Sequence, residues 1–109
     1  EGAEYLVIDS IVKNHEKFDL LAIEFHDLKD NLKLFTRSIE DLKKYFNIVH
    51  IHGNNYSAPI NDQGFTDTME ITFISHKFSQ NPTMSKYTYP IQGLDQPNKI
   101  SKPDFKLTF

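Results

Sequence analysis

The chain has 109 residues, of which 39% are hydrophobic and 25% charged, a composition typical of a soluble globular domain. Its net charge of −3 gives no reason to expect nucleic acid or a membrane surface as a partner, and no apolar run reaches the roughly 20 residues that cross a bilayer. The absence of cysteine excludes a disulfide scaffold, a zinc–thiolate site and a cysteine nucleophile. It is compatible with a reducing compartment, and we expect a cytoplasmic location.

The first half of the chain reads as a short helix, a buried strand and a long amphipathic helix. Apolar residues recur at helical spacing over 3–14 and predict the short helix. The run Leu20–Phe25 (LLAIEF) is nearly all apolar, as in a strand buried on both faces. We expect Asp27 or Asp30 to cap the long helix at 28–46. The apolar residues of that helix step by four and three and would face a sheet: Leu28, Leu32, Phe35, Ile39, Leu42 and Phe46.

The second half predicts two strands, a long loop and a tail. Asn47–His52 alternates, which would place Ile48, His50 and His52 on one side of a strand. Residues 53–67 are rich in turn-forming types and read as a long loop, which we expect to be mobile or to gate a crevice. Met69–Ile74 is a second strand, and because no helix separates the two, we expect an antiparallel pair. Prolines break every pattern after Ser79, and 104–109 could add a short edge strand.

This order of elements predicts the second half of an alternating α/β fold, namely a partial domain at 1–76 followed by an extended, irregular Pro-rich tail at 77–109. The start at Glu1-Gly2, inside what reads as a strand-to-helix turn, suggests a piece of a longer protein. The strand Leu20–Phe25 would then lack a neighbour on one side. We expect self-association through that exposed edge.

Three polar clusters follow or precede regular elements: EGAEY at Glu1–Tyr5, EFH at Glu24–His26 and HIHGNNY at His50–Tyr56. The carboxyl ends of parallel strands line a common crevice, where ligands bind. We therefore expect Glu1, His26 and either His50 or His52 to meet at one edge of a sheet. This convergence is the main reason to interpret the chain as part of an enzyme.

His26 and Glu24 are the first catalytic candidates. An imidazole titrates near working pH and can serve as a general base, although His26 could instead only begin the following helix. Glu24 lies within an apolar strand, where a charge needs a partner or a site. Its alternative is a carboxylate at the strand rim that reaches solvent. Glu1 and Glu4 lie near a helix N-terminus, where the helix dipole alone would stabilise them.

The third cluster offers further candidates. His50 and His52 project to the same side of a strand, a spacing that suits either catalysis, a metal or a pair of structural hydrogen bonds. Asn54 and Asn55, with Tyr56 beside them, could bind the hydroxyls of a substrate or form the turn after Gly53.

The segment EGAEYLVIDSI, followed in order by IEFH, HIHGNN and MEITFI, resembles the FkbM-type branch of the class I S-adenosylmethionine (SAM)-dependent methyltransferases. The resemblance implies the C-terminal half of a Rossmann-like methyltransferase sheet, with parallel strands and an antiparallel last strand inserted between the two before it. It also implies methyl transfer from SAM to a hydroxyl of a small molecule or glycan, and it favours Glu1 facing the cofactor or acceptor pocket. The glycine-rich SAM loop of the family is not found in this chain.

Two other functions remain open at this point. A metal-dependent hydrolase could use His26, His50, His52 and Glu24, although no spaced motif such as H-E-x-x-H is present. A non-catalytic binding or assembly module would account for the missing cofactor loop.

Overall fold

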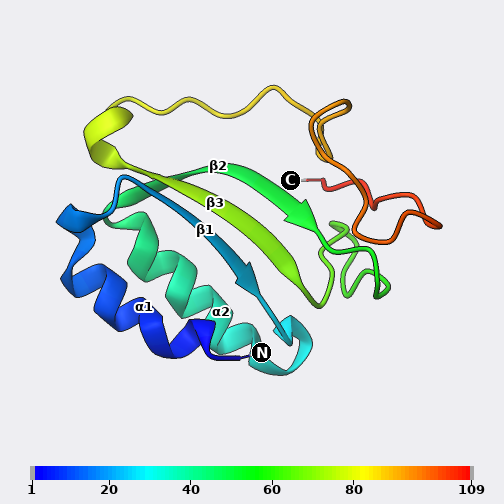
Figure 1. Ribbon diagram of the computed structural model, residues 1–109, viewed down its shortest axis with the longest axis horizontal. Coiled ribbons are helices and arrows are strands. Elements are labelled where there is room, and N and C mark those ends of the chain that lie inside the picture. Colours follow the sequence, from blue (N-terminus) through cyan, green and yellow to red (C-terminus); the bar gives the residue numbers. More distant parts are fainter. Residues whose placement is uncertain (1, 109) are drawn as a thin grey trace.

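The computed structural model describes residues 2–108. Glu1, the expected cofactor-facing residue, lies outside the described residues. The elements in chain order (Figure 1) are α1 (Glu4–Lys13), a short 3₁₀ helix η1 (His15–Lys17), β1 (Leu20–Phe25), α2 (Leu28–Lys43), β2 (Phe46–Gly53), β3 (Met69–Ser75) and a second 3₁₀ helix η2 (His76–Phe78). Both expected helices and all three main strands are confirmed. The helix expected to reach residue 46 ends at Lys43, because Phe46 already pairs in the sheet.

The three strands form one sheet in the order β1-β3-β2, and β3 pairs antiparallel with both neighbours. The expected Rossmann-like half-sheet is therefore wrong, because no two of the strands within residues 2–108 pair in parallel. β1 and β2 point the same way, as their connection through α2 requires, but β3 lies between them. No helix connects β2 to β3, so the chain returns antiparallel after a loop and inserts at the position that a parallel neighbour of β1 would take.

A bulge changes the alternation expected for β2. Ile48 lies opposite Phe73, whereas His50 lies opposite Thr72, the adjacent residue of β3. Val49 is the extra residue, so Ile48 and His50 lie on opposite faces of the sheet. The expected common side is wrong for Ile48, while His50 and His52 do share a face because they pair with Thr72 and Glu70.

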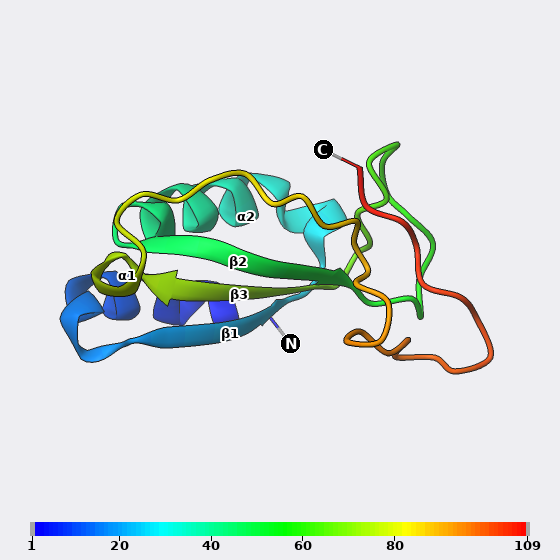
Figure 2. The ribbon, with the colours of Figure 1, turned by 90° about the horizontal axis from the view of Figure 1, so that it is seen from above.

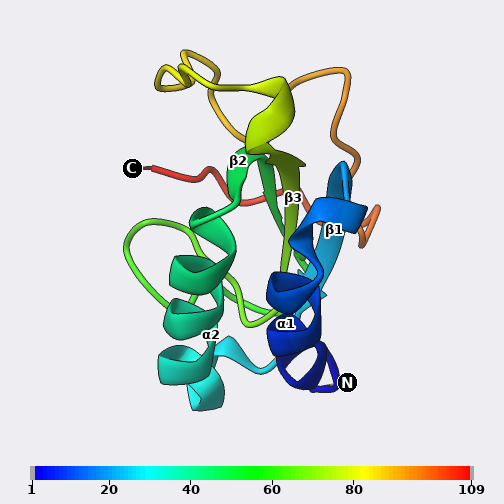
Figure 3. The same cartoon turned by 90° about the vertical axis from the view of Figure 1, so that its left-hand side faces the viewer.

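Both helices cover one face of the sheet (Figure 3), where the apolar core lies. Phe25 on β1 is fully buried and contacts a ring from each helix, with centroids 5.8 Å from Tyr5 of α1 and 5.2 Å from Phe35 of α2. The core thus fixes the end of β1 between the two helices. No helix of the described residues is long and apolar enough to cross a membrane.

The segment after η2 is irregular, as expected, but it is packed rather than merely extended. It runs back along the sheet and folds at the end where β1 and β2 stop (Figure 2). Tyr89 and Leu107 are buried in the core, and they form an isolated bridge in which the Leu107 N–H donates to the Tyr89 carbonyl at 2.9 Å. Of the edge strand expected at 104–109, the described residues form only this bridge.

Gly64 is the position where the tail passes closest to the loop between β2 and β3. Its φ is +86°, and a Cβ there would overlap the backbone carbonyl of Lys106. We expect Gly64→Ala to destabilise the fold by about 1–3 kcal/mol, measured by urea unfolding, because it adds this overlap to the strain of a positive φ. Gly93→Ala is the matched control: its φ is +85°, but a Cβ would meet nothing within 4 Å. Equal losses in the two variants would contradict the close approach.

Candidate functional site

The carboxyl ends of β1 and β2 and the beginning of α1 lie at one end of the sheet (Figure 1). His26 follows β1 directly and is held there by its backbone. Its N–H donates to Glu4 Oε1 at 2.7 Å, and its carbonyl accepts from the Tyr5 hydroxyl at 2.7 Å. Two residues of the first helical turn therefore fix the position of His26.

The imidazole of His26 lies between two carboxylates. Its Nδ1 is 3.3 Å from Glu4 Oε1, and its Nε2 is 3.3 Å from Glu24 Oε2. The Glu4 side chain is 11% exposed, whereas that of Glu24 is 42% exposed. A carboxylate on Nδ1 orients the ring and leaves Nε2 on the side of the exposed Glu24, where it could accept a proton.

The ionisation of Glu4 reflects these contacts. Burial alone would raise the pKa of its carboxyl, but the backbone N–H groups of Glu4 and His26 and the imidazole of His26 together hold that pKa below its usual value of 4.5. Glu4 therefore stays a carboxylate at neutral pH, as an orienting partner of His26 needs to be.

A surface pocket of about 460 Å³ opens beside His26. Asn54, at the end of β2, reaches across it, with its Nδ2 3.4 Å from Glu24 Oε1. Thus EFH and the beginning of GNN, which are separated by about thirty residues, do meet in space. The pocket is lined by Glu24, His26, Asn54, Tyr56, Ser57, Asp67 and Thr68.

The turn after His26 depends on a distant residue. Neither Asp27 nor Asp30 provides the expected side-chain cap: Asp27 has a φ of 53° and makes no side-chain cap hydrogen bond. Asp67, from the loop before β3, accepts hydrogen bonds from the N–H of Leu28 at its carbonyl and from the N–H of Lys29 at its side chain. This loop therefore stabilises both the start of α2 and one wall of the pocket.

His50 and His52 lie on the face of the sheet that points away from the helices, the same face as Glu24 and Glu70, and they contact carboxylates of the tail. His50 Nε2 is 2.8 Å from Asp95 Oδ1, and His52 Nε2 is 3.1 Å from Asp104 Oδ2. Both carboxylate side chains are only 7% exposed. These contacts account for both histidines as residues that hold the tail on the sheet, and neither histidine lines the pocket beside His26.

Asn55 is fully buried and also holds the tail. Its Nδ2 donates to the carbonyls of Lys99 and Lys102 at 3.1 and 2.9 Å, and its Oδ1 accepts from the N–H of Lys99 at 2.6 Å. Because these bonds use its amide, the geometry favours the structural alternative for Asn55 over substrate binding. Asn54 and the exposed Tyr56 remain at the pocket.

Several residues of this region were not identified from the sequence as partners: Asp67, Glu70, Asp95 and Asp104. Glu4 was considered only for its position near a helix N-terminus. Each of them acts on a residue far away in the chain, so no local motif marks it. The only sequence feature that points to them is the frequency of carboxylates near the ends of the helices and strands.

The geometry does not support the alternative of a metal-dependent hydrolase. Within residues 2–108, no group of three or more His, Asp or Glu side chains is arranged to hold a metal ion. The four residues proposed for such a site are divided between two places, because His50 and His52 pair with the tail.

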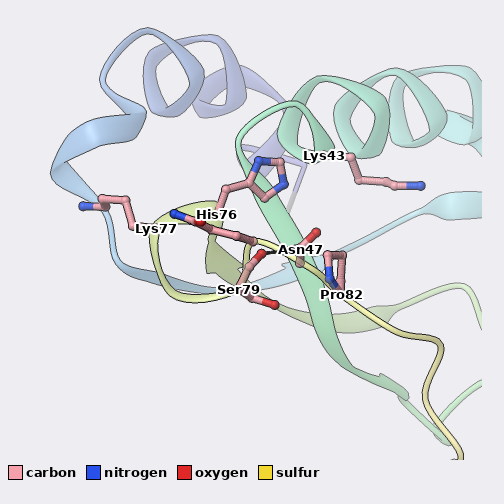
Figure 4. Close-up of a pocket in the computed structure, with 7 residues that line it drawn as sticks. Lys43, Asn47, His76, Lys77, Ser79 and Pro82 are labelled. Atoms are coloured by element: carbon pink, nitrogen blue, oxygen red, sulfur yellow. Dashed lines mark hydrogen bonds between the residues drawn. The ribbon is translucent and has the colours of Figure 1, made fainter.

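A second depression, of about 610 Å³, lies at the opposite end of the sheet, where β2 begins and β3 ends. It carries three basic side chains, from Lys43, His76 and Lys77. Figure 4 shows the ammonium groups of Lys43 and Lys77 pointing away from each other, and that of Lys77 is 2.9 Å from Asp19 Oδ1. These side chains therefore do not converge on an anion.

Comparisons with protein-family models, curated proteins and solved structures find no significant match to this chain. The resemblance to FkbM-type methyltransferases therefore stays a prediction. The candidate site stands on its geometry alone.

Tyr5 provides a test of the packing around His26. Burial and the neighbouring carboxylates of Glu4, Asp27 and Asp67 raise the pKa of Tyr5 to about 12 from its ordinary 10.0. The folded state favours the neutral phenol, so this contribution to stability is complete below pH 10 and is lost as the pH rises towards 12. We expect the tyrosinate absorbance of the folded chain to include a step near pH 12 that Tyr5→Phe removes. Tyr87→Phe, at an exposed tyrosine, should leave that step unchanged.

Proposed function

We propose that this chain is the C-terminal part of a SAM-dependent methyltransferase that methylates a hydroxyl of a small molecule or glycan in the cytoplasm, with His26 as the general base. The observation that carries the proposal is the position of the His26 imidazole between Glu4 and Glu24 at the wall of an open pocket. The ordered resemblance of EGAEY, IEFH, HIHGNN and MEITFI to that family supports it.

The residues of the site match the needs of a hydroxyl acceptor. Methylation of a hydroxyl by SAM forms a bond from the oxygen to the methyl carbon and breaks the bond from that carbon to the sulfonium sulfur, so S-adenosylhomocysteine leaves and the oxygen must lose its proton. In our proposal Nε2 of His26 accepts that proton, and Glu4 holds the ring through Nδ1 and stabilises the imidazolium that results. Asn54 and Tyr56 orient the acceptor in the pocket.

The described glycines do not fit a cofactor-binding loop. Gly53 faces Thr66, and Gly64 faces the backbone of Lys106, while Gly2 and Gly93 face open space. None of them lies in a G-x-G sequence. We therefore propose that SAM is bound by residues outside this chain in a longer protein, and we assign this chain to the acceptor side of the site.

The sheet edge at β1 belongs to the same proposal. β1 pairs only with β3 among the described strands, so the backbone groups on its other side are open to a further strand. We propose that this edge pairs with another strand, either from the longer protein or from a second copy of the chain.

The test uses the complete natural protein that carries this sequence, incubated with SAM labelled at the methyl group and with a panel of sugars and small alcohols. We expect the labelled methyl group to be transferred to a hydroxyl oxygen, whose position in the product is determined by mass spectrometry. Absence of transfer to every acceptor, with SAM bound or not, would favour the non-catalytic binding module.

A further inference from the structure

Glu24 is the residue of the pocket whose contacts a ligand would most easily replace. Its two oxygens are 3.3 Å from His26 Nε2 and 3.4 Å from Asn54 Nδ2, both longer than the roughly 2.9 Å of a good hydrogen bond. Its side chain is 42% exposed. Stronger donors from a ligand could therefore displace both contacts at little cost.

The position of Glu24 in the sheet also favours a positively charged partner. Glu24 lies directly opposite Glu70 on β3, and like charges in such a pair repel. Glu70 is itself held by other groups, since it accepts from Asn98 Nδ2 at 2.8 Å and lies 3.6 Å from His52 Nδ1. Neither Glu24 nor Glu70 contacts an ammonium or guanidinium group within the described residues, so a cation bound at Glu24 would relieve the repulsion.

The lining of the pocket is also negatively charged, which favours a cationic ligand. Two carboxylates, from Glu24 and Asp67, line it, and no Lys or Arg does. Lys99 lies beside the pocket, with its ammonium 5.8 Å from the centre of the Tyr56 ring. The exposed ring of Tyr56 thus already attracts one cation, as aromatic faces do.

Resting on the function proposed above, we propose that the acceptor is an amino alcohol, with a protonated amine on the carbon next to the hydroxyl that is methylated, as in a 2-amino-2-deoxy sugar. The hydroxyl donates to His26 Nε2 and the ammonium binds Glu24. The 3.3 Å between His26 Nε2 and Glu24 Oε2 favours this spacing, because two donors on neighbouring carbons are close enough together to reach both acceptors. Tyr56 packs against the apolar face of the sugar ring.

The binding part of this proposal is tested by NMR titration of the complete natural protein that carries this sequence, followed at the backbone amides of His26 and Asn54. The probes are the methyl glycosides of glucosamine, glucose and glucuronic acid. We expect the glucosaminide to bind about tenfold more tightly than the glucoside, as charge-assisted hydrogen bonds allow, and the glucuronide to bind least. Equal binding of glucosaminide and glucoside, tighter binding of the glucuronide, or no binding of any of the three would overturn the inference.

Two variants separate charge from fold. Glu24→Gln keeps the shape of the side chain and should abolish the preference for the glucosaminide, whereas Glu40→Gln, at an exposed position of α2 outside the pocket, should preserve it. If Glu24→Gln unfolds, the wild-type chain at high salt gives the same information, because screening should reduce the preference. A preference that persists in high salt and in Glu24→Gln contradicts the role of Glu24.

The two proposals fail in different ways. Methyl transfer by the complete protein that is equally efficient for acceptors with and without an amine overturns the amino-alcohol inference and leaves the methyltransferase function standing. Amine-dependent binding at His26 and Asn54 without any methyl transfer supports the recognition by Glu24 and overturns the proposed reaction.

Discussion

In the complete protein, His26→Ala should lower the turnover of methyl transfer by about 10²–10⁴-fold, the usual contribution of a positioned general base. The affinity for SAM should change little, because this imidazole contacts Glu4 and Glu24 on the acceptor side. The measurement is the initial rate of label transfer at saturating SAM and acceptor.

Two further variants make this result specific. His76→Ala changes a histidine at the opposite end of the sheet and should retain normal turnover. Glu4→Gln keeps a hydrogen-bond acceptor near the His26 N–H but removes the charge, so it should lower turnover less than His26→Ala. Near-normal turnover of His26→Ala would contradict the role of general base and would mean that His26 only forms part of the turn between β1 and α2.

Periodicity and composition were sufficient to predict the regular elements. The four-and-three spacing of 28–46 predicted α2, and the apolar runs predicted β1 and β3, because both signals come from local burial. The sequence also predicted that the clusters EFH and HIHGNNY meet, but through His26 and either His50 or His52; the contact in the structure joins Glu24 to Asn54 instead. These residues meet because β1 and β2 point the same way on either side of β3, and not because parallel strands are paired.

The partners of the polar residues could not be predicted, since they depend on the path of the tail. His52 and Asp104 are 52 residues apart in the chain, and Lys29 and Asp67 are 38 apart. Nothing in HIHGNNY distinguishes a histidine that faces a substrate from one that faces a buried aspartate. A Pro-rich segment without periodicity gave no indication that Tyr89 and Leu107 would enter the core.

The bulge at Val49 is a second feature that could not be predicted from the sequence. Strict alternation placed Ile48 with the two histidines, but one extra residue in β2 moves Ile48 to the opposite face. A register of this kind is determined by the pairing with β3, which a single strand read alone does not contain. The expected sharing of a face by His50 and His52 survived because both lie after the bulge.

Asn55→Ala should be the most destabilising of the substitutions in the third polar cluster, by about 2–4 kcal/mol in urea unfolding. The amide of Asn55 is fully buried and bonds the backbone of Lys99 and Lys102. Alanine leaves two backbone carbonyls and one N–H of the tail without these partners, and it also leaves a cavity where the buried amide was. The tail around 99–103 should then exchange its amide hydrogens faster than α2 does.

The neighbouring Asn54→Ala is the matched control, because it removes the same amide from a half-buried position. Asn54 makes only a 3.4 Å contact with Glu24 and a 3.1 Å hydrogen bond from the N–H of Tyr56, so its loss should cost less than about 1 kcal/mol. In the complete protein the order should reverse for function: Asn54→Ala should raise the KM of the acceptor, and Asn55→Ala should act mainly through stability. An Asn55→Ala chain that is as stable as Asn54→Ala would mean that the tail does not depend on this buried amide, and it would reopen Asn55 as a ligand-binding residue.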